Sequence, residues 1–309
     1  MTEKYDSRFF KVSVAKSFFA LFVFLLISFF LSDEISAAAL DGIKLALNVI
    51  IPTAFPFMVL SDLASHYFEF EKSILLSRLF ERIFKINRSG LTAFFSGIAG
   101  GFPIGAKASL DLYGNGKISK CECERLMCFS NVSSPAYTVS AVGIGMLSNF
   151  KLGLVLFFTS LVSAVITGCI TGINKNVSNF SDFIQEQKYD LVKSIKRSAA
   201  ASVNVIFFIS FFSALCAIIE YMPIPETLKF IVIPFIEVGS ATSYLSDSCI
   251  FSSKFIIGAI AFSLSFSGLS VIMQSLALDG AKDISIKKCL LYKLLQGFIS
   301  FLIILALPI

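Results

Sequence analysis

The sequence predicts an all-α polytopic membrane protein, with about seven transmembrane spans and two re-entrant hairpins in an inverted repeat. Composition, interrupted apolar runs and the distribution of basic residues carry this prediction. Of the 309 residues, 56% are hydrophobic and 15% are charged, whereas a soluble domain carries about 25% charged residues. Runs such as residues 152–173 approach the roughly 20 apolar residues that cross a bilayer. A multi-pass protein of the cell membrane, surrounded by lipid, is therefore expected.

The first half of the chain is expected to contain four spans, one surface helix and one hairpin. Residues 70–87 place basic residues between apolar ones at helical spacing, which is typical of an amphipathic helix on a membrane surface. Ser119 and Glu122 fit a capping box at the start of the third span. The predicted spans are 14–31, 37–60, 119–147 with a break at 131–135, and 152–173, and the hairpin covers 91–113.

The second half repeats this order after a cytoplasmic linker at 175–198. Its predicted elements are a span at 199–219, a hairpin at 230–245, a span at 254–278 broken at 265–270, and a last span at 289–307. Asn48 and Asn204 lie in matching apolar contexts of the two halves. Three spans in each half would insert the second half upside down, as in many transporters. The predicted units are therefore an N-terminal span at 1–35, a first repeat at 36–174, the linker, and a second, inverted repeat at 199–309.

Basic residues indicate the orientation. Of the 26 Lys and Arg residues, 21 fall in segments that this layout places on the cytoplasmic side or on the first hairpin. Positive charge is retained on the cytoplasmic side of membrane proteins. The N-terminus is therefore expected in the cytoplasm and the C-terminus outside.

Breaks inside apolar sequence are the main functional signal. In lipid each freed backbone N–H or C=O costs several kcal/mol, so breaks occur where the backbone is packed in protein or lines a cavity. In transporters the ends of such half-helices hold the substrate. The predicted substrate site comprises Gly101, Phe102, Pro103, Gly105, Lys107, Ser109, Asn131, Ser133, Ser134, Glu237, Ser240, Thr242, Ser265, Ser267 and Gln274.

Lys107 decides the expected substrate class. An ammonium at the centre of a span is costly, so a lysine just past the hairpin tip favours an anionic solute, with Glu237 as its partner or as a proton acceptor. The alternative is that Lys107 extends to the cytoplasmic surface and has no part in binding.

Several segments resemble the sporulation integral membrane protein YlbJ family, which carries the nucleoside-recognition Gate domain. The matching segments are 101–107, 118–120, 124–126, 131–135, 142–146, 267–271 with Gln274, and 291–295. The resemblance implies a fold similar to concentrative nucleoside transporters, with substrate between two hairpins and two broken spans. It also implies a role in spore formation, where the family is linked to movement of dipicolinic acid. The second hairpin departs from this pattern because residues 237–243 are not glycine-rich.

The leading hypothesis is a secondary transporter of a small organic anion, with dipicolinic acid as the substrate that the resemblance implies. A nucleoside carrier is the alternative within transport, and a non-transporting scaffold of the spore envelope is the alternative from another class. An enzyme is not expected, because the sequence shows no nucleophile beside a base. No cofactor, metal site or nucleic-acid partner is expected, whereas a coupling ion (Na⁺ or H⁺) and a homo-oligomer fit the resemblance.

Overall fold

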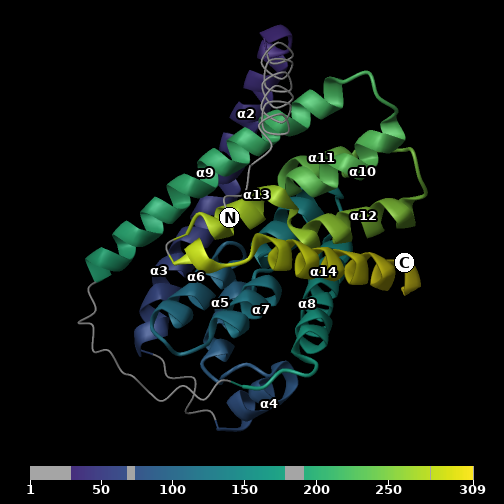
Figure 1. The fold of residues 1–309 in the computed structure, drawn as a ribbon. Coiled ribbons are helices and arrows are strands. Elements are labelled where there is room, and N and C mark those ends of the chain that lie inside the picture. The colour runs from purple at the N-terminus through teal and green to yellow at the C-terminus, as the bar shows by residue number, and fades with distance from the viewer. Residues whose placement is uncertain (1–28, 68–73, 178–190, 279, 309) are drawn as a thin grey trace, which may run out of the picture.

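The computed structural model describes residues 29–67, 74–177, 191–278 and 280–308, and within these ranges it contains helices and no strand (Figure 1). The all-α prediction is confirmed. In chain order the helices are α2 (Ser32–Leu45), η1 (Ala46–Ile50), α3 (Ile51–Tyr67), α4 (Ile74–Phe84), α5 (Gly90–Gly100), α6 (Ile104–Gly114), α7 (Lys120–Ser130), η3 (Ala136–Met146), α8 (Phe150–Gly172), α9 (Leu191–Tyr221), α10 (Glu226–Ile236), α11 (Val238–Ser246), α12 (Ser253–Phe266), α13 (Gly268–Leu276), η4 (Ala281–Asp283) and α14 (Ile286–Ala306). Segments η1 and η3 are π-helical, and η4 is a 3₁₀ turn.

Four segments are long and apolar enough to cross a membrane: α8, α9, α12 with α13, and α14. A fifth is the pair Ser32–Ile50 and Ala54–Leu60, which is bent by 54° around Pro52. These five match the predicted second, fourth, fifth, sixth and seventh spans. Most of the predicted first span lies outside the described residues, and the predicted third span is two short helices, α7 and η3. The number of seven spans therefore stays a prediction.

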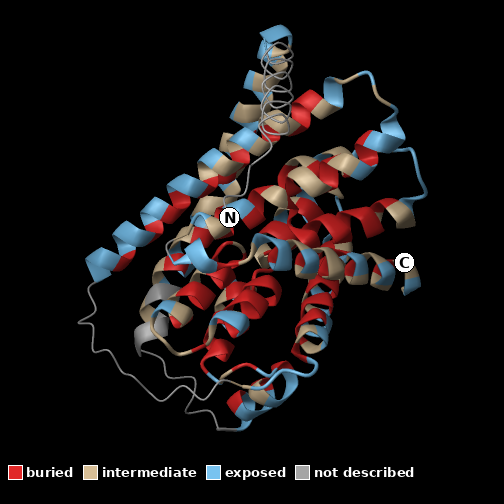
Figure 2. Cartoon of the chain, in the orientation of Figure 1, coloured by how far each residue is buried: buried red, intermediate tan, exposed pale blue. Residues whose placement is uncertain are grey.

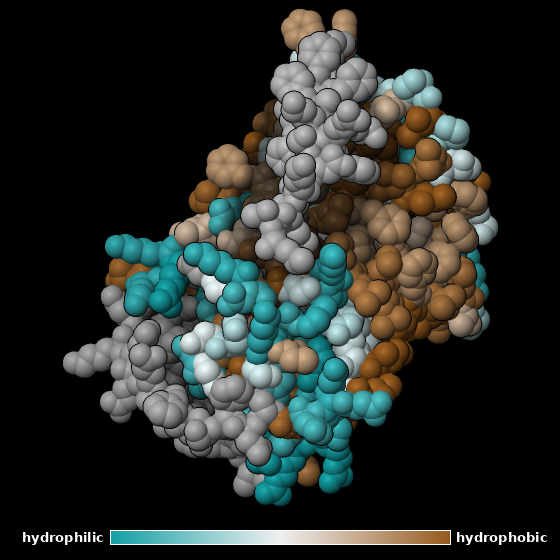
Figure 3. Space-filling model, in the orientation of Figure 1, coloured by the Kyte–Doolittle hydropathy of each residue, from teal (hydrophilic) through white to brown (hydrophobic). Residues whose placement is uncertain are grey.

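Large apolar side chains cover the outer faces of the long helices. On α9, Phe207 is 67% exposed and Phe211 is 57% exposed, and on α14 Leu302 is 60% exposed. Helix α12, by contrast, is buried along most of its length (Figure 2). In the view of Figure 3, apolar side chains cover the right-hand side and hydrophilic ones gather in the lower half. Exposed apolar surface of this kind marks a surface that faces lipid.

Helix α4 occupies the central part of the predicted surface helix, and residues 70–73 lie outside the described ranges. Phe80 and Phe84 are buried, and the ring of Phe84 stacks on that of Phe129 in α7 at 4.8 Å. Leu75 is 85% exposed and Leu79 is 50% exposed on the opposite face. The helix is therefore anchored by one face and presents apolar side chains on the other, and its contact with a membrane surface stays a prediction.

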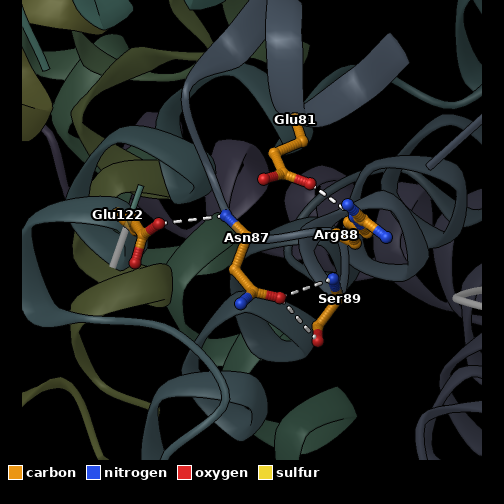
Figure 4. Close-up of polar contacts among 5 residues, drawn as sticks. All are labelled: Glu81, Asn87, Arg88, Ser89 and Glu122. Carbon is orange, nitrogen blue, oxygen red and sulfur yellow. Dashed lines mark hydrogen bonds and ion pairs between the residues drawn. The ribbon is translucent and has the colours of Figure 1, made fainter. Parts of the chain in front are cut away.

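Polar contacts tie the end of α4 to the start of α7 (Figure 4). Glu122 completes the predicted capping box with Ser119, and its second carboxylate oxygen accepts a hydrogen bond from the backbone N–H of Asn87 at 2.9 Å. The guanidinium of Arg125, which is 2% exposed, donates to the backbone carbonyls of Phe84 and Lys85. Arg125 therefore satisfies the carbonyl end of α4.

Replacing Arg125 with methionine is expected to lower the melting temperature in detergent by several degrees. The change leaves two backbone carbonyls without their charged donor, and a hydrogen bond to a charged group contributes about 1.5–3 kcal/mol. Arg88→Met is the matched control, because Arg88 forms an exposed ion pair with Glu81 and such pairs contribute about 0–1 kcal/mol. Equal melting temperatures for the two variants would contradict the anchoring role of Arg125.

Candidate functional site

The first hairpin break packs directly on the break in the predicted third span. Gly101 has φ +80°, and a Cβ placed there would lie 2.7 Å from the Cβ of Ser134. A Cβ on Gly105 would lie 2.2 Å from the carbonyl oxygen of Ser130, where α7 ends. Such distances leave no room for a side chain. The two glycines therefore allow the backbones of two interrupted helices to touch.

The second half has the same arrangement. Helices α12 and α13 are separated by Ser267, and both Ser267 and Gly268, the first residue of α13, have φ +73°. A Cβ on Gly268 would lie 3.0 Å from the carbonyl oxygen of Ile236 and 3.2 Å from the Cα of Glu237, the residue between α10 and α11. In both halves, then, the hairpin break meets the span break. The predicted repeat expects this pairing, and the inversion of one half relative to the other stays a prediction.

A central cavity lies between the two pairs of breaks. Four of the predicted site residues line it: Phe102, Ser134, Glu237 and Gln274. The hydroxyl groups of Tyr137 and Thr242 are hydrogen-bonded at 3.0 Å and join the two halves beside it. Only about 20 Å³ of the cavity admits the centre of a water molecule. That is room for about one water, so the central cavity is closed to larger solutes in this conformation.

Glu237 is the one acid among the described residues that line the central cavity. The residue is 1% exposed, and its carboxylate accepts a hydrogen bond from the backbone N–H of Ser240 at 2.6 Å, which caps α11. Among the described residues no lysine or arginine forms an ion pair with it. The predicted pairing with Lys107 is absent from this conformation.

Lys107 lies on α6 away from the central cavity, and its ammonium pairs with Asp111 at 3.0 Å. Both residues line a second cavity, the basic cavity, with Lys196, Arg197 and Asn204 of α9. About 570 Å³ of this cavity is open to water. Lys107 therefore lines a wide, water-accessible cavity and does not lie at the hairpin tip.

The other predicted site residues have three kinds of surroundings. Three serines are buried and hydrogen-bonded to neighbouring helices or turns. Ser109 bonds to Gly105 and Ser130, Ser133 bonds to Thr138, and Ser265 bonds to Ser163. Asn131 is buried against Ser275 and Lys293, and Pro103 is buried at the start of α6. Ser240 bonds Ser213 and lines a third cavity. These contacts hold neighbouring helices in position. Of the predicted site residues, only Phe102, Ser134, Glu237 and Gln274 line the central cavity together.

The third cavity, the acidic cavity, lies beside α11 and is lined by Asp41, Glu220 and Asp247. About 350 Å³ of it is open to water, and it shares Leu45 and Gly239 with the central cavity. None of these acids was among the predicted site residues. Glu220 and Asp247 lie at helix ends, and Asp41 pairs with Lys44 within α2, so each looks like an ordinary surface acid in the sequence.

Helix α9 lines all three cavities in sequence order. Residues 196–204 face the basic cavity, Val205 and Ile209 face the central cavity, and residues 213–220 face the acidic cavity. At 1.5 Å per residue, the distance from residue 196 to residue 220 is about 36 Å, enough to cross the hydrocarbon core of a bilayer. The three cavities therefore lie one after another along α9, whose course through the protein Figure 1 shows.

Fold and site together define a multi-pass, all-helical membrane protein whose helix breaks converge on a closed cavity. The chain is similar to the sporulation integral membrane protein YlbJ of Bacillus subtilis (strain 168), with 32% identity over 120 residues. This match covers 38% of the present chain and 29% of the length of YlbJ. No family model matches the chain, and no solved structure does.

Proposed function

We propose that the chain is a secondary transporter that carries a small organic anion through the membrane along α9. The observation that supports this proposal is the series of three cavities, of which the two outer ones are open and the central one is closed. Alternating access requires that a solute path is never open to both sides at once, and a path closed at its midpoint meets this condition. Opening the central cavity toward one side or the other would require the hairpin breaks to separate from the span breaks.

Charge along this path favours an anion that enters from the basic cavity. Lys196 and Arg197 lie at the end of α9 that the basic-residue rule assigns to the cytoplasm, and Lys107 joins them there. Clefts lined by one sign of charge concentrate ligands of the opposite sign. Dipicolinate, a ring with two carboxylates, is the first compound to test, because the chain resembles a sporulation membrane protein.

A proton is the coupling ion that we propose, with Glu237 as its acceptor. A buried carboxylate without a basic partner repels an anion that enters the central cavity. Protonation removes this repulsion, so anion and proton would cross together.

We further propose the membrane topology that the sequence predicts. It has Gate-like repeats, re-entrant hairpins and seven spans, with the N-terminus in the cytoplasm and the C-terminus outside.

Uptake into proteoliposomes tests the function, and Lys107→Ala tests the anion site. Wild-type protein is expected to accumulate radiolabelled dipicolinate, and Lys107→Ala to reduce the rate at least about tenfold, which corresponds to about 1.4 kcal/mol. Lys229→Ala is the matched control, because Lys229 also pairs with an acid of its own helix and its side chain is 11% exposed, against 13% for Lys107. The control is expected to transport normally.

The same assay separates the alternatives. Equal rates for Lys107→Ala and wild type would remove Lys107 from the path and leave the transporter in place. Uptake of a nucleoside without uptake of dipicolinate would favour a nucleoside carrier. Absence of uptake of either compound by folded protein would favour a scaffold.

A further inference from the structure

A buried lysine on α14, Lys293, lies against the break between α7 and η3 and has no place in the path described above. Its ammonium donates to the backbone carbonyl of Asn131 at 2.9 Å and to the side-chain oxygen of Gln296 at 3.0 Å. Asn131 is the C-cap residue of α7, directly after its last residue, Ser130. The ammonium therefore meets the carbonyl end of a half-helix, which carries partial negative charge.

Lys293 is 3% exposed, and among the described residues no carboxylate forms an ion pair with it. The titratable groups that face it are two thiols, Cys128 on α7 and Cys289 on α14. A buried charge without a counter-ion is costly. The partial charge of the half-helix and the oxygen of Gln296 are therefore the main groups that stabilise the ammonium.

Asn131 also carries an unsatisfied acceptor. Its side-chain Oδ1 is buried and has no hydrogen-bond partner among the described residues, and an amide oxygen is a ligand that cations take. A small cavity lined by Asn131, Ser275 and Lys293 leaves about 20 Å³ open to the centres of water molecules. This is room for one water beside the ammonium.

We propose that the ammonium of Lys293 is a tethered cation: it occupies a cation site at the end of α7 in place of a free sodium ion. In transporters with broken helices, unwound carbonyls and half-helix C-terminal ends coordinate Na⁺ or H⁺. Here the chain's own side chain binds that carbonyl end. The inference that the lysine ammonium replaces a coupling ion rests on the proposed transport function. The existence of the cation site does not depend on that function.

Thermal unfolding in three salts tests the tethered cation. Purified Lys293→Ala and wild-type protein are unfolded in detergent with a thiol-reactive dye, in sodium, methylammonium or choline chloride at equal ionic strength. The wild-type melting temperature is expected to be the same in all three salts. In choline, Lys293→Ala is expected to melt at least about 4 °C lower, and sodium or methylammonium, which fit the vacated space, should restore at least half of this loss.

Two further variants serve as controls. Lys293→Arg keeps a cation in place and is expected to melt independently of the salt. Lys288→Ala removes a lysine from the same helix whose side chain is 51% exposed and paired with Glu124, and it is expected to show no preference among the cations. If Lys293→Ala does not fold in choline, the yield of folded protein purified in methylammonium replaces the melting temperature as the readout.

Two results would overturn the inference. One is sodium-specific stabilisation of the wild type, which would show a free-cation site elsewhere. The other is a Lys293→Ala variant whose stability or yield is equal in all three salts. Neither readout measures uptake, so this test is independent of the proposed transport function. The tethered-cation proposal can be refuted in a protein that transports, and it can be supported in a protein that transports none of the tested solutes.

Discussion

Replacing Gly97 with alanine is expected to abolish recovery of folded protein, or to lower its free energy of unfolding by about 3 kcal/mol or more. A Cβ on Gly97 would lie 1.8 Å from the carbonyl oxygen of Ser130 and 3.1 Å from the Cα of Gly105. The obstructing atoms belong to the backbone, so no side chain can rotate away. To accept a single methyl group, α5 would have to move off both α6 and the end of α7.

Gly114→Ala is the matched control for this prediction. Gly114 ends α6, the same hairpin, is exposed, and has no heavy atom within 4 Å of the position that its Cβ would take. Alanine there is expected to leave stability unchanged or to raise it by up to about 1 kcal/mol. Fluorescence-detected size-exclusion chromatography and thermal unfolding in detergent compare the two variants. A Gly97→Ala protein as stable as Gly114→Ala would show that the three backbones do not pack as described.

Positions of the helix breaks could be predicted from the sequence, because breaks depend on local residue types. Glycine, proline or serine interrupts apolar sequence near residues 101, 133 and 267, and the structure breaks its helices there. The position of the break in the second hairpin was harder to predict from the sequence. This break is limited to Glu237, which ends α10 and caps α11, so one capping carboxylate takes the place of the expected glycine-rich turn.

The start of α9 differs from the prediction. The linker was expected to extend to residue 198, but the helix begins at Leu191. Lysine and arginine are good helix formers, and neither glycine nor proline occurs between residues 191 and 221. The basic residues taken as a loop therefore form the first turns of a long helix. This extension is what brings Lys196 and Arg197 to the basic cavity.

Contacts between distant segments could not be predicted from a single sequence. Lys293 and Asn131 are 162 positions apart, and Tyr137 and Thr242 are 105 apart. No local pattern marks either pair, because each depends on how whole helices pack. The pairing of Lys107 with Asp111 is different: the two are four residues apart on one helix, a spacing at which opposite charges meet, so this partner could have been found from the sequence.

Glu237→Gln is expected to uncouple anion uptake from a proton gradient while leaving the protein folded. The amide oxygen of glutamine can still accept the hydrogen bond from the backbone N–H of Ser240 that caps α11, but the amide cannot take up a proton. The wild type should concentrate dipicolinate at least about tenfold in response to an inward proton gradient, an effect of about 1.4 kcal/mol. The variant should exchange internal for external dipicolinate and show no response to the gradient.

Two comparisons separate coupling from capping at Glu237. Glu237→Ala removes the cap as well, and loss of a cap costs about 1 kcal/mol, so this variant should melt below Glu237→Gln. Glu226→Gln changes an exposed acid on the preceding helix that pairs with Lys229, and it should keep gradient-driven uptake. If Glu237→Gln also kept gradient-driven uptake, Glu237 would be a helix cap only and the proton would need another acceptor. If Glu237→Gln lost both gradient-driven uptake and exchange, the carboxyl group of Glu237 would contribute to substrate binding. A neutral amide of the same shape would then cap α11 but would not support transport.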